Sequence, residues 1–240
     1  MGVAGAAALA RANFPALQTL ILSTNDLGPE GAVALAQANF PALRELDLSD
    51  KSDPRTELGT AGAVALAAAN WPRLEKLRLA CVGVGNEGAS ALARAAWPRL
   101  QVLDLERNDI SAASAAALAA AAWPCLQTLL LCYNELHAAG AASTLAAAAW
   151  LDLKALDLDH NDLGPLGTVA LSSSKWPNLE SLRVCMNDLG DGGARGMAAS
   201  VGLLSVWPSL QRLELYGNDF GPAGKAALAA ERRPGLQILF

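Results

Sequence analysis

The stretch WPCLQTLLLCYN, residues 123–134, decides the fold, because closely similar stretches recur along the whole chain. Each copy has an aromatic residue followed by proline, then leucines spaced L-x-x-L-x-L, then an asparagine three residues after the last leucine. Other copies are FPALQTLILSTN at 14–25, WPRLQVLDLERN at 97–108, WPNLESLRVCMN at 176–187 and WPSLQRLELYGN at 207–218. Such a repeat is typical of a solenoid, in which each unit buries its apolar face against the next.

The repeats follow one another at a spacing of about 26 residues, and two of the spacings are about five residues longer. One insertion lies after the second strand, at 49–59, and the other lengthens a helix, at 194–207. We therefore predict a single domain over residues 1–240 with about eight repeats, of which the first and last are incomplete. The sequence does not decide whether the chain is free-standing or part of a longer protein.

One repeat illustrates the local structure that we expect. Residues 17–22 alternate in the manner of a strand. Pro29 suits the first turn of a helix, and the alanine-rich residues 31–36 favour continuing it. The helix ends at Phe40 and Pro41, because proline disfavours helical geometry in the residue before it.

The asparagine of each repeat ends the strand, and its side chain can hydrogen-bond the backbone of the following loop. Copies stacked at this place would form a ladder: Asn25, Asn108, Asn134, Asn161, Asn187 and Asn218. The ladder is interrupted at Lys51 and Val82, so we expect the second and third repeats to be locally irregular.

The six tryptophans all fall at the end of the helix of a repeat: Trp71, Trp97, Trp123, Trp150, Trp176 and Trp207. Their regular spacing favours a buried aromatic spine over a cofactor site or a sugar-binding platform.

The pattern LxxLxLxxNxLGxxGAxALAxA, carried by stretches such as LQRLELYGNDFGPAGKAALAA, resembles the leucine-rich repeat of the ribonuclease-inhibitor-like class, and its GAxALA helix resembles GALA-type repeats. The resemblance covers nearly the whole chain. It implies an α/β solenoid in the shape of a horseshoe, with parallel strands on the concave face and helices on the convex face. The repeats are shorter than the alternating long units of ribonuclease inhibitor, and no F-box segment of the kind found in GALA-type effectors is evident.

Composition and charge exclude several classes of protein. The net charge of −5, with both signs interspersed, argues against binding to nucleic acid or to an anionic membrane. No uninterrupted apolar run is long enough to span a bilayer, and the N-terminus does not resemble a signal peptide. The four cysteines form no CxxC pair, and we expect free thiols in a cytoplasmic protein.

The resemblance implies that the side chains between the paired leucines face the hollow of the horseshoe. The central column would be Ile21, Asp47, Arg78, Asp104, Leu130, Asp157, Arg183, Glu214 and Phe240. Charges alternate along it, with Glu45 and Lys76 alongside, and neighbouring strands bring such side chains close enough to pair. These charges either satisfy one another or form a polar surface for a partner.

A second cluster contains tyrosine, arginine and methionine, which are favoured at protein interfaces. The predicted partner-binding residues are Asp104, Glu106, Arg107, Leu130, Tyr133, Asp157, Asp159, His160, Arg183, Met186, Glu214 and Tyr216. The sequence does not identify the partner.

We expect no metal, cofactor or catalytic residue. Asp157, Asp159 and His160 are suitable ligand types, but no further ligand closes a site. An open sheet offers no dry pocket for acid–base chemistry, and His137 is expected to face solvent. The glycines of 83–88 lie in an ordinary strand-to-helix turn, which makes a phosphate site there a weak hypothesis.

We therefore expect a non-enzymatic scaffold that binds a protein or peptide on its concave face. The alternative is self-association through the edges of the terminal strands, where Ile238 and Phe240 would present apolar groups. A less favoured hypothesis is a regulator of an enzyme, such as a GTPase, or a ubiquitin-ligase substrate adaptor. The charged insertion KSDPRTE (51–57) is either a functional loop or a tolerated surface insertion.

Overall fold

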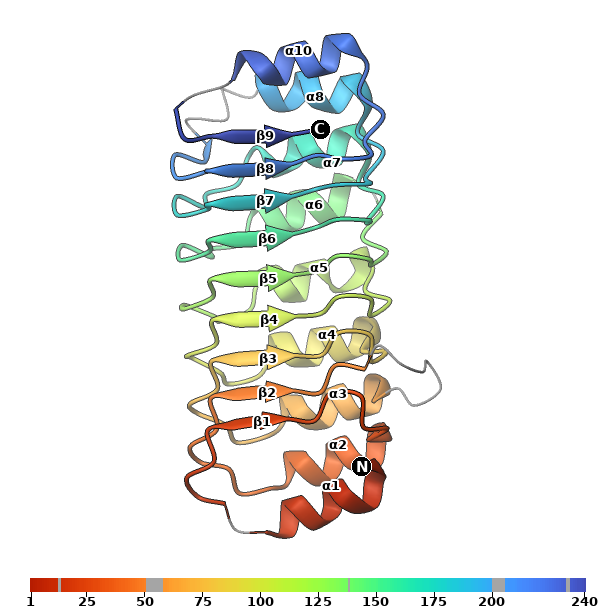
Figure 1. Ribbon diagram of the computed structural model, residues 1–240, viewed down its shortest axis with the longest axis vertical. Coiled ribbons are helices and arrows are strands. Elements are labelled where there is room, and N and C mark those ends of the chain that lie inside the picture. Colours follow the sequence, from red (N-terminus) through yellow and green to blue (C-terminus); the bar gives the residue numbers. More distant parts are fainter. Residues whose placement is uncertain (13, 51–57, 138, 200–205, 232–233) are drawn as a thin grey trace. The chain divides into compact units, whose positions relative to one another are not determined.

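A computed structural model describes residues 1–12, 14–50, 58–137, 139–199, 206–231 and 234–240. The chain forms two compact units: unit 1 is Met1–Ile110 with Ala121–Leu126, and unit 2 is Ser111–Ala120 with Gln127–Phe240. Helices and strands alternate along the chain in both units, which confirms the predicted α/β repeat (Figure 1). The assignment of residues 1–240 to a single domain stays a prediction.

In unit 1 the strands β1 to β4 pair in parallel, with the central leucines Leu20, Leu46, Leu77 and Leu103 in register. The strands are three residues each, so β1 is shorter than the predicted 17–22. The elements are α1 (Gly2–Arg11), β1 (Thr19–Ile21), α2 (Gly28–Ala36), β2 (Glu45–Asp47), α3 (Gly59–Ala67), β3 (Lys76–Arg78), α4 (Gly85–Ala93) and β4 (Val102–Asp104).

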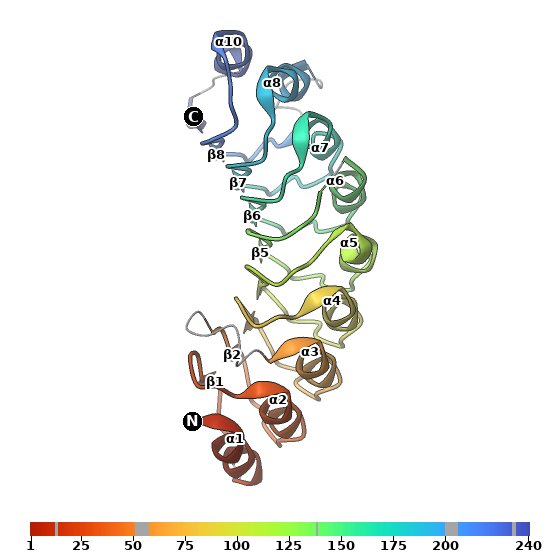
Figure 2. The same ribbon diagram turned by 90° about the vertical axis from the view of Figure 1, so that its right-hand side faces the viewer.

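In unit 2 the strands β5 to β9 also pair in parallel. The elements are α5 (Ala112–Ala119), β5 (Thr128–Leu130), α6 (Ala139–Ala146), β6 (Ala155–Asp157), α7 (Gly164–Leu171), β7 (Ser181–Arg183), α8 (Gly190–Ala199), β8 (Arg212–Glu214), α10 (Pro222–Ala230) and β9 (Gln237–Leu239). Within each unit the strands form one layer and the helices another (Figure 2).

The register of the last strand corrects one position of the predicted central column. Leu239, and not Phe240, pairs with Glu214. The final repeat has one residue fewer between its proline and its strand, and the apolar alternation alone did not reveal that deletion. Ile238 is buried, contrary to the expectation that it presents an apolar group at this end, while the ring of Phe240 packs edge-on against Phe220 at 6.0 Å.

The core lies between the two layers. The central leucines of β2 to β8 are buried and Leu20 of β1 is half-buried, and the predicted tryptophan spine is confirmed because all six indoles are at most 2% exposed. Burial of side chains this large supplies much of the stabilisation of each repeat. The helices pack closely because small residues face one another: a Cβ added to Gly88 of α4 would lie 2.9 Å from the Cβ of Ala63 in α3.

The asparagines of the ladder hold the turns after their strands, and all are buried except Asn25, which is half-buried. The Asn187 Oδ1 accepts hydrogen bonds from the backbone N–H groups of Asn161 at 3.1 Å and Leu163 at 3.2 Å, while its Nδ2 donates to the carbonyls of Leu158 and Cys185. Most of these partners belong to the preceding repeat and not to the loop that follows. Asn108, Asn161 and Asn218 make bonds of the same kind, so these asparagines fasten one repeat to the one before it.

The expected irregularity at Val82 is wrong. The Val82 N–H donates to the Asn108 Oδ1 at 3.2 Å, and its neighbours Cys81 and Gly83 have the same left-handed φ as in regular repeats. The repeat keeps its turn because the next asparagine supplies the bond. Lys51, the insertion 51–57 and residues 200–205 of the second insertion lie outside the described residues. In the part of the chain that the structure describes, none of the helices has both the length and the apolar content needed to cross a bilayer.

Candidate partner-binding surface

The turns after β5, β6, β7 and β8 each display two residues around a buried asparagine, and of these eight residues His160 is half-buried and the others are exposed. His160 and Asp162 flank Asn161, and Met186 and Asp188 flank Asn187. The flanking residues have φ of 52° to 55°, in the left-handed region that most side chains avoid. The asparagine hydrogen bonds hold this conformation, so the side chains before and after it project away from the core.

The residues directly before Asn134, Asn161 and Asn187, together with Tyr216 two residues before Asn218, form a row that is rich in aromatic and sulfur atoms; His160 is half-buried and the other three are exposed. The ring of Tyr133 stacks on His160, with centroids 4.0 Å apart and an interplanar angle of 13°. The Met186 side chain lies over Gly217, where an added Cβ would be 2.2 Å from its sulfur. Tyr133, Met186 and Tyr216 are 41%, 52% and 46% exposed. We call Tyr133, His160, Met186 and Tyr216 the aromatic–methionine row.

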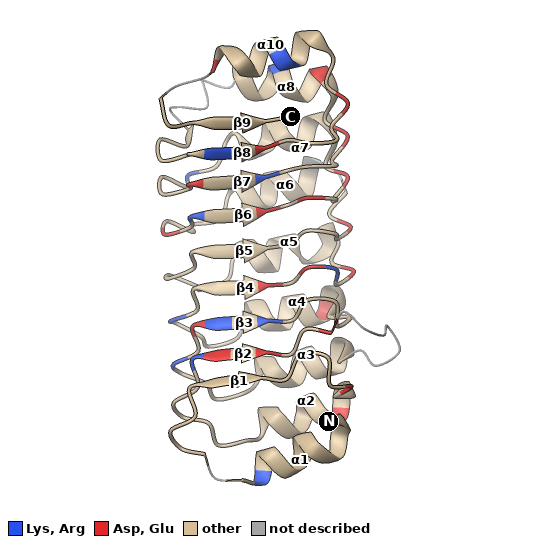
Figure 3. Ribbon diagram, viewed as in Figure 1, with Lys and Arg blue, Asp and Glu red and all other residues tan. Residues whose placement is uncertain are grey.

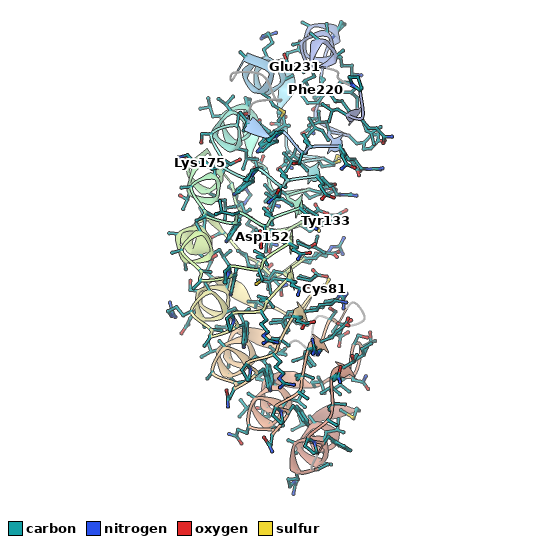
Figure 4. All side chains as sticks on the ribbon, turned by 90° about the vertical axis from the view of Figure 1, so that its left-hand side faces the viewer. Cys81, Tyr133, Asp152, Lys175, Phe220 and Glu231 are labelled. Atoms are coloured by element: carbon teal, nitrogen blue, oxygen red, sulfur yellow. The ribbon has the colours of Figure 1, made fainter. Side chains whose placement is uncertain are left out.

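Figure 4 shows Tyr133 on the strand side of unit 2 and Lys175 on the opposite, helix side. We call the strand side, with the turns that follow the strands, the strand face. The aromatic–methionine row lies on this face and is held by backbone hydrogen bonds between repeats, such as Tyr133 N–H to the Asp159 carbonyl at 2.8 Å and Met186 N–H to the Tyr216 carbonyl at 2.8 Å. The row is therefore presented by a fixed framework.

An ion cluster lies beside the row. The Arg183 Nε is 3.1 Å from Asp157 Oδ2 and 3.0 Å from Asp159 Oδ2, its Nη2 is 2.5 Å from Asp159 Oδ2, and its Nη1 is 3.4 Å from Glu214 Oε2. The Arg212 Nε pairs with Glu214 Oε1 at 2.6 Å. The alternation of charge that the sequence predicted for Asp157, Arg183 and Glu214 is confirmed as direct ion pairing.

The cluster is partly buried, and its electrostatics follow from that. Desolvation lowers the pKa of the Arg183 guanidinium, but the hydrogen bond and charges of Asp159, with Asp157 and Glu214, outweigh it and raise the pKa. Burial, followed by the charge and hydrogen bond of Asp159, raises the pKa of the Cys185 thiol to about 12. Cys185 is thus a protonated, buried thiol at neutral pH.

The predicted ladder in unit 1 is arranged differently. Glu45 pairs with Lys76 at 3.6 Å, as expected, but Arg78 pairs with Glu45, diagonally placed on β2. That hydrogen bond from Arg78 lowers the pKa of Glu45. Asp47 instead accepts the N–H of Ser49 at 3.0 Å, and Asp104 accepts the N–H of Glu106 at 3.0 Å. A strand-final aspartate therefore caps the turn of its own repeat.

The predicted site residues fall into two groups by location. Asp104, Glu106 and Arg107 belong to unit 1, where Arg107 is exposed and lies 3.9 Å from Glu106. The other nine predicted residues belong to unit 2, and the structure brings them onto one strand face there: Leu130, Tyr133, Asp157, Asp159, His160, Arg183, Met186, Glu214 and Tyr216. Leu130 is half-buried, in register with Asp157.

Exposure separates the predicted residues further. Asp104, Asp159 and Glu214 are buried, and their carboxylates hold neighbouring groups of the chain. Arg212 was missed by the sequence reasoning, although its position two residues before Glu214 on the same face of β8 could have revealed it. His137 is exposed, as predicted, and its Nδ1 lies 3.2 Å from Asp162 Oδ2.

Other kinds of site have less support on this surface. The Arg183 side chain contacts both Asp157 and Asp159, so those carboxylates hold a cation of the chain itself. Within the described residues, no three His, Cys, Asp or Glu side chains are grouped as metal ligands would be. Two open hollows of unit 2, of about 450 and 560 Å³, lie at the helix side, and both are lined by Leu151, Ser173 and Lys175.

Comparisons with known proteins agree with this architecture. The family model described as Leucine Rich repeat matches residues 15–36, 73–93, 99–119, 152–172 and 177–198. The crystal structure of the leucine-rich repeat-containing protein LegL7 from Legionella pneumophila is similar, with 18% identity and a TM-score of 0.52, over 98% of this chain and 86% of that one. A plant peptide hormone receptor, RGFR1 in complex with RGF2, aligns at 18% identity with a TM-score of 0.48, over 95% of this chain and 33% of the receptor chain. A search of curated proteins gives no match.

Proposed function

We propose that this chain, which is a leucine-rich-repeat protein, is a non-enzymatic scaffold that binds a protein or peptide through the strand face of unit 2. The observation that supports the proposal is the aromatic–methionine row. Tyr133, Met186 and Tyr216 expose large side chains after β5, β7 and β8 of one parallel sheet, and His160 after β6 lies between Tyr133 and Met186. Tyrosine and methionine provide much contact area at interfaces, and a fixed framework reduces the entropy lost on binding.

The buried charges support the same proposal in a different way. Asp159 and Glu214 are occupied by contacts with Arg183, Arg212 and the backbone, so we assign them to holding the face and not to touching the partner. The exposed residues among those predicted, Tyr133, Met186 and Tyr216, then carry most of the binding energy, since hot spots are few and central.

Self-association through the terminal strands has weaker support, because the apolar side chain of Ile238 on β9 is buried within unit 2. Regulation of an enzyme, membership of the ribonuclease-inhibitor-like class or of the GALA-type repeats, and a cytoplasmic location stay predictions from the sequence.

The test is a selection of unstructured 12-residue peptides from a displayed library on the purified chain. We expect the selected pool to bind at least about 100-fold more weakly to the variant Tyr133→Ala/Met186→Ala/Tyr216→Ala, because each of the three truncations at a hot spot costs more than about 1 kcal/mol and about 1.4 kcal/mol corresponds to a factor of ten. The matched control is Leu151→Ala/Leu166→Ala. It truncates two apolar side chains of unit 2 that do not belong to the row and are 58% and 71% exposed.

Circular dichroism and the unfolding midpoint of both variants would verify that the fold is unchanged. A pool that binds the row variant as well as the parent would refute the proposal. Loss of binding by the control variant alone would instead place the site at the helix side, around the hollows lined by Leu151.

A further inference from the structure

A line of exposed carboxylates runs beside the aromatic–methionine row. Each of four successive repeats of unit 2 has an acidic residue directly after the buried asparagine of the turn, and all four are exposed: Glu135, Asp162, Asp188 and Asp219. Three of the four have φ of 52° to 55°, so the backbone fixes where they point. We call these four residues the acidic row. Figure 3 shows the red segments of these turns beyond the ends of β6, β7 and β8.

The basic groups on this face do not neutralise the row. Arg183 contacts Asp157 and Asp159 through Nε, Asp159 through Nη2 and Glu214 through Nη1, so all three of its nitrogens are engaged. Arg212 is paired with Glu214. The ion cluster therefore holds three carboxylates against two guanidinium groups and adds negative charge to the face. Of the acidic row, Asp162 lies 3.2 Å from the imidazole of His137.

From this we propose that the partner of the strand face is a cationic segment: a protein or peptide stretch that places lysine or arginine side chains along the acidic row and apolar or aromatic side chains on the aromatic–methionine row. The inference rests on the proposed function and specifies the chemistry of the partner. An acidic segment would meet four exposed carboxylates and no unengaged arginine of the ion cluster.

Two synthetic peptides serve as probes. Both have 12 residues. Every second position carries leucine or tyrosine in turn, and the positions between them are all lysine in one peptide and all glutamate in the other. Their affinity for the purified chain is measured by fluorescence anisotropy at about 50 mM and about 300 mM salt, because surface charges are screened over roughly 10 Å at 0.1 M ionic strength. We expect the lysine peptide to bind at least about tenfold more tightly than the glutamate peptide at low salt.

The acidic row is tested with the variant Glu135→Gln/Asp188→Asn/Asp219→Asn. Asparagine tolerates the left-handed φ of Asp188 and Asp219, so the turns are retained while the charge is removed. We expect this variant to bind the lysine peptide about fivefold more weakly at low salt, with a smaller loss at high salt.

The matched control is Asp152→Asn/Glu180→Gln/Glu231→Gln, which raises the net charge of unit 2 by the same amount away from the row. Figure 4 labels Asp152 and Glu231. We expect less than about a twofold change, since these carboxylates lie in segments that precede β6, β7 and β9, whereas the acidic row follows the strands. Equal losses in the two variants would show that only the net charge attracts the peptide and would overturn the inference.

The variant Tyr133→Ala/Met186→Ala/Tyr216→Ala separates the two proposals. If it weakens both peptides while the acidic-row variant weakens neither, the strand face binds a partner but the partner is not cationic. If neither variant changes the affinity of either peptide, the proposed function fails together with this inference. Tighter binding of the glutamate peptide would refute the inference alone.

Discussion

Replacement of Asp159 by alanine tests whether the ion cluster maintains the strand face. The Asp159 carboxylate is 4% exposed and accepts hydrogen bonds from the backbone N–H of Cys185 at 2.7 Å and from the Arg183 guanidinium. Alanine would leave that buried N–H without its partner, which costs about 1–3 kcal/mol. Because the Arg183 side chain is 43% exposed, screening by solvent reduces the ion pair itself to about 1 kcal/mol. We expect a total loss of about 2–4 kcal/mol.

The assay is urea unfolding followed by circular dichroism, with tryptophan fluorescence as a second probe, since repeat proteins can unfold in parts. Asp159→Asn keeps an oxygen that can accept the Cys185 N–H and should cost less than Asp159→Ala. Asp162→Asn, at an exposed side chain and with a residue that tolerates its left-handed φ, is the control and should change stability by less than about 0.5 kcal/mol. A loss below about 1 kcal/mol for Asp159→Ala would refute the view that this carboxylate holds the turn.

One further prediction concerns two core tryptophans, and another concerns an ion pair on the sheet of unit 1. Trp207→Phe should cost about 1 kcal/mol more than Trp97→Phe in urea unfolding, because the Trp207 Nε1 donates to the Ser174 Oγ at 2.8 Å whereas the Trp97 Nε1 has no partner among the described residues; equal costs would contradict this. The lowered pKa of Glu45 means that its pair with Arg78 stabilises the fold above the ordinary glutamate pKa of 4.5 and is lost as the pH falls below it. Glu45→Gln should therefore lower stability at pH 7 and flatten its decline between pH 5 and 3, and an unchanged pH profile would disprove the assignment.

The fold was predictable because the same sequence pattern recurs in every repeat and predicts the same strand and helix each time. The L-x-x-L-x-L spacing determines the strands, and the aromatic residue before proline ends each helix, so errors in a single repeat do not change the architecture. The errors that remain are local. The register of β9 depends on a one-residue deletion before Ile238, and the turn at Val82 depends on a hydrogen bond from Asn108, one repeat further along.

The candidate site was less predictable, because the alternation of a strand does not continue past its last residue. Extending the alternation of β6 beyond its last residue places Asp159 among the partner-binding residues. In the structure the chain leaves the strand after Asp157, and the Asp157 carboxylate accepts the N–H of Asp159 at 3.0 Å. Asp159 is buried, as is Cys185 at the equivalent place after β7, whereas Tyr216 at that place after β8 is exposed.

The exposed row also shows which part of the surface the fold leaves undetermined. Left-handed backbone costs a residue with a side chain about 1–2 kcal/mol, and the asparagine bonds that offset this cost involve no atom of the exposed side chain. Equivalent positions of this one chain accordingly carry seven residue types: Thr24, Cys81, Arg107, Tyr133, His160, Met186 and Gly217. The turn therefore does not select among them. The proposed contact with a partner would act on the exposed side chains, and it would account for the presence of Tyr133, His160 and Met186 on the same turns as the carboxylates.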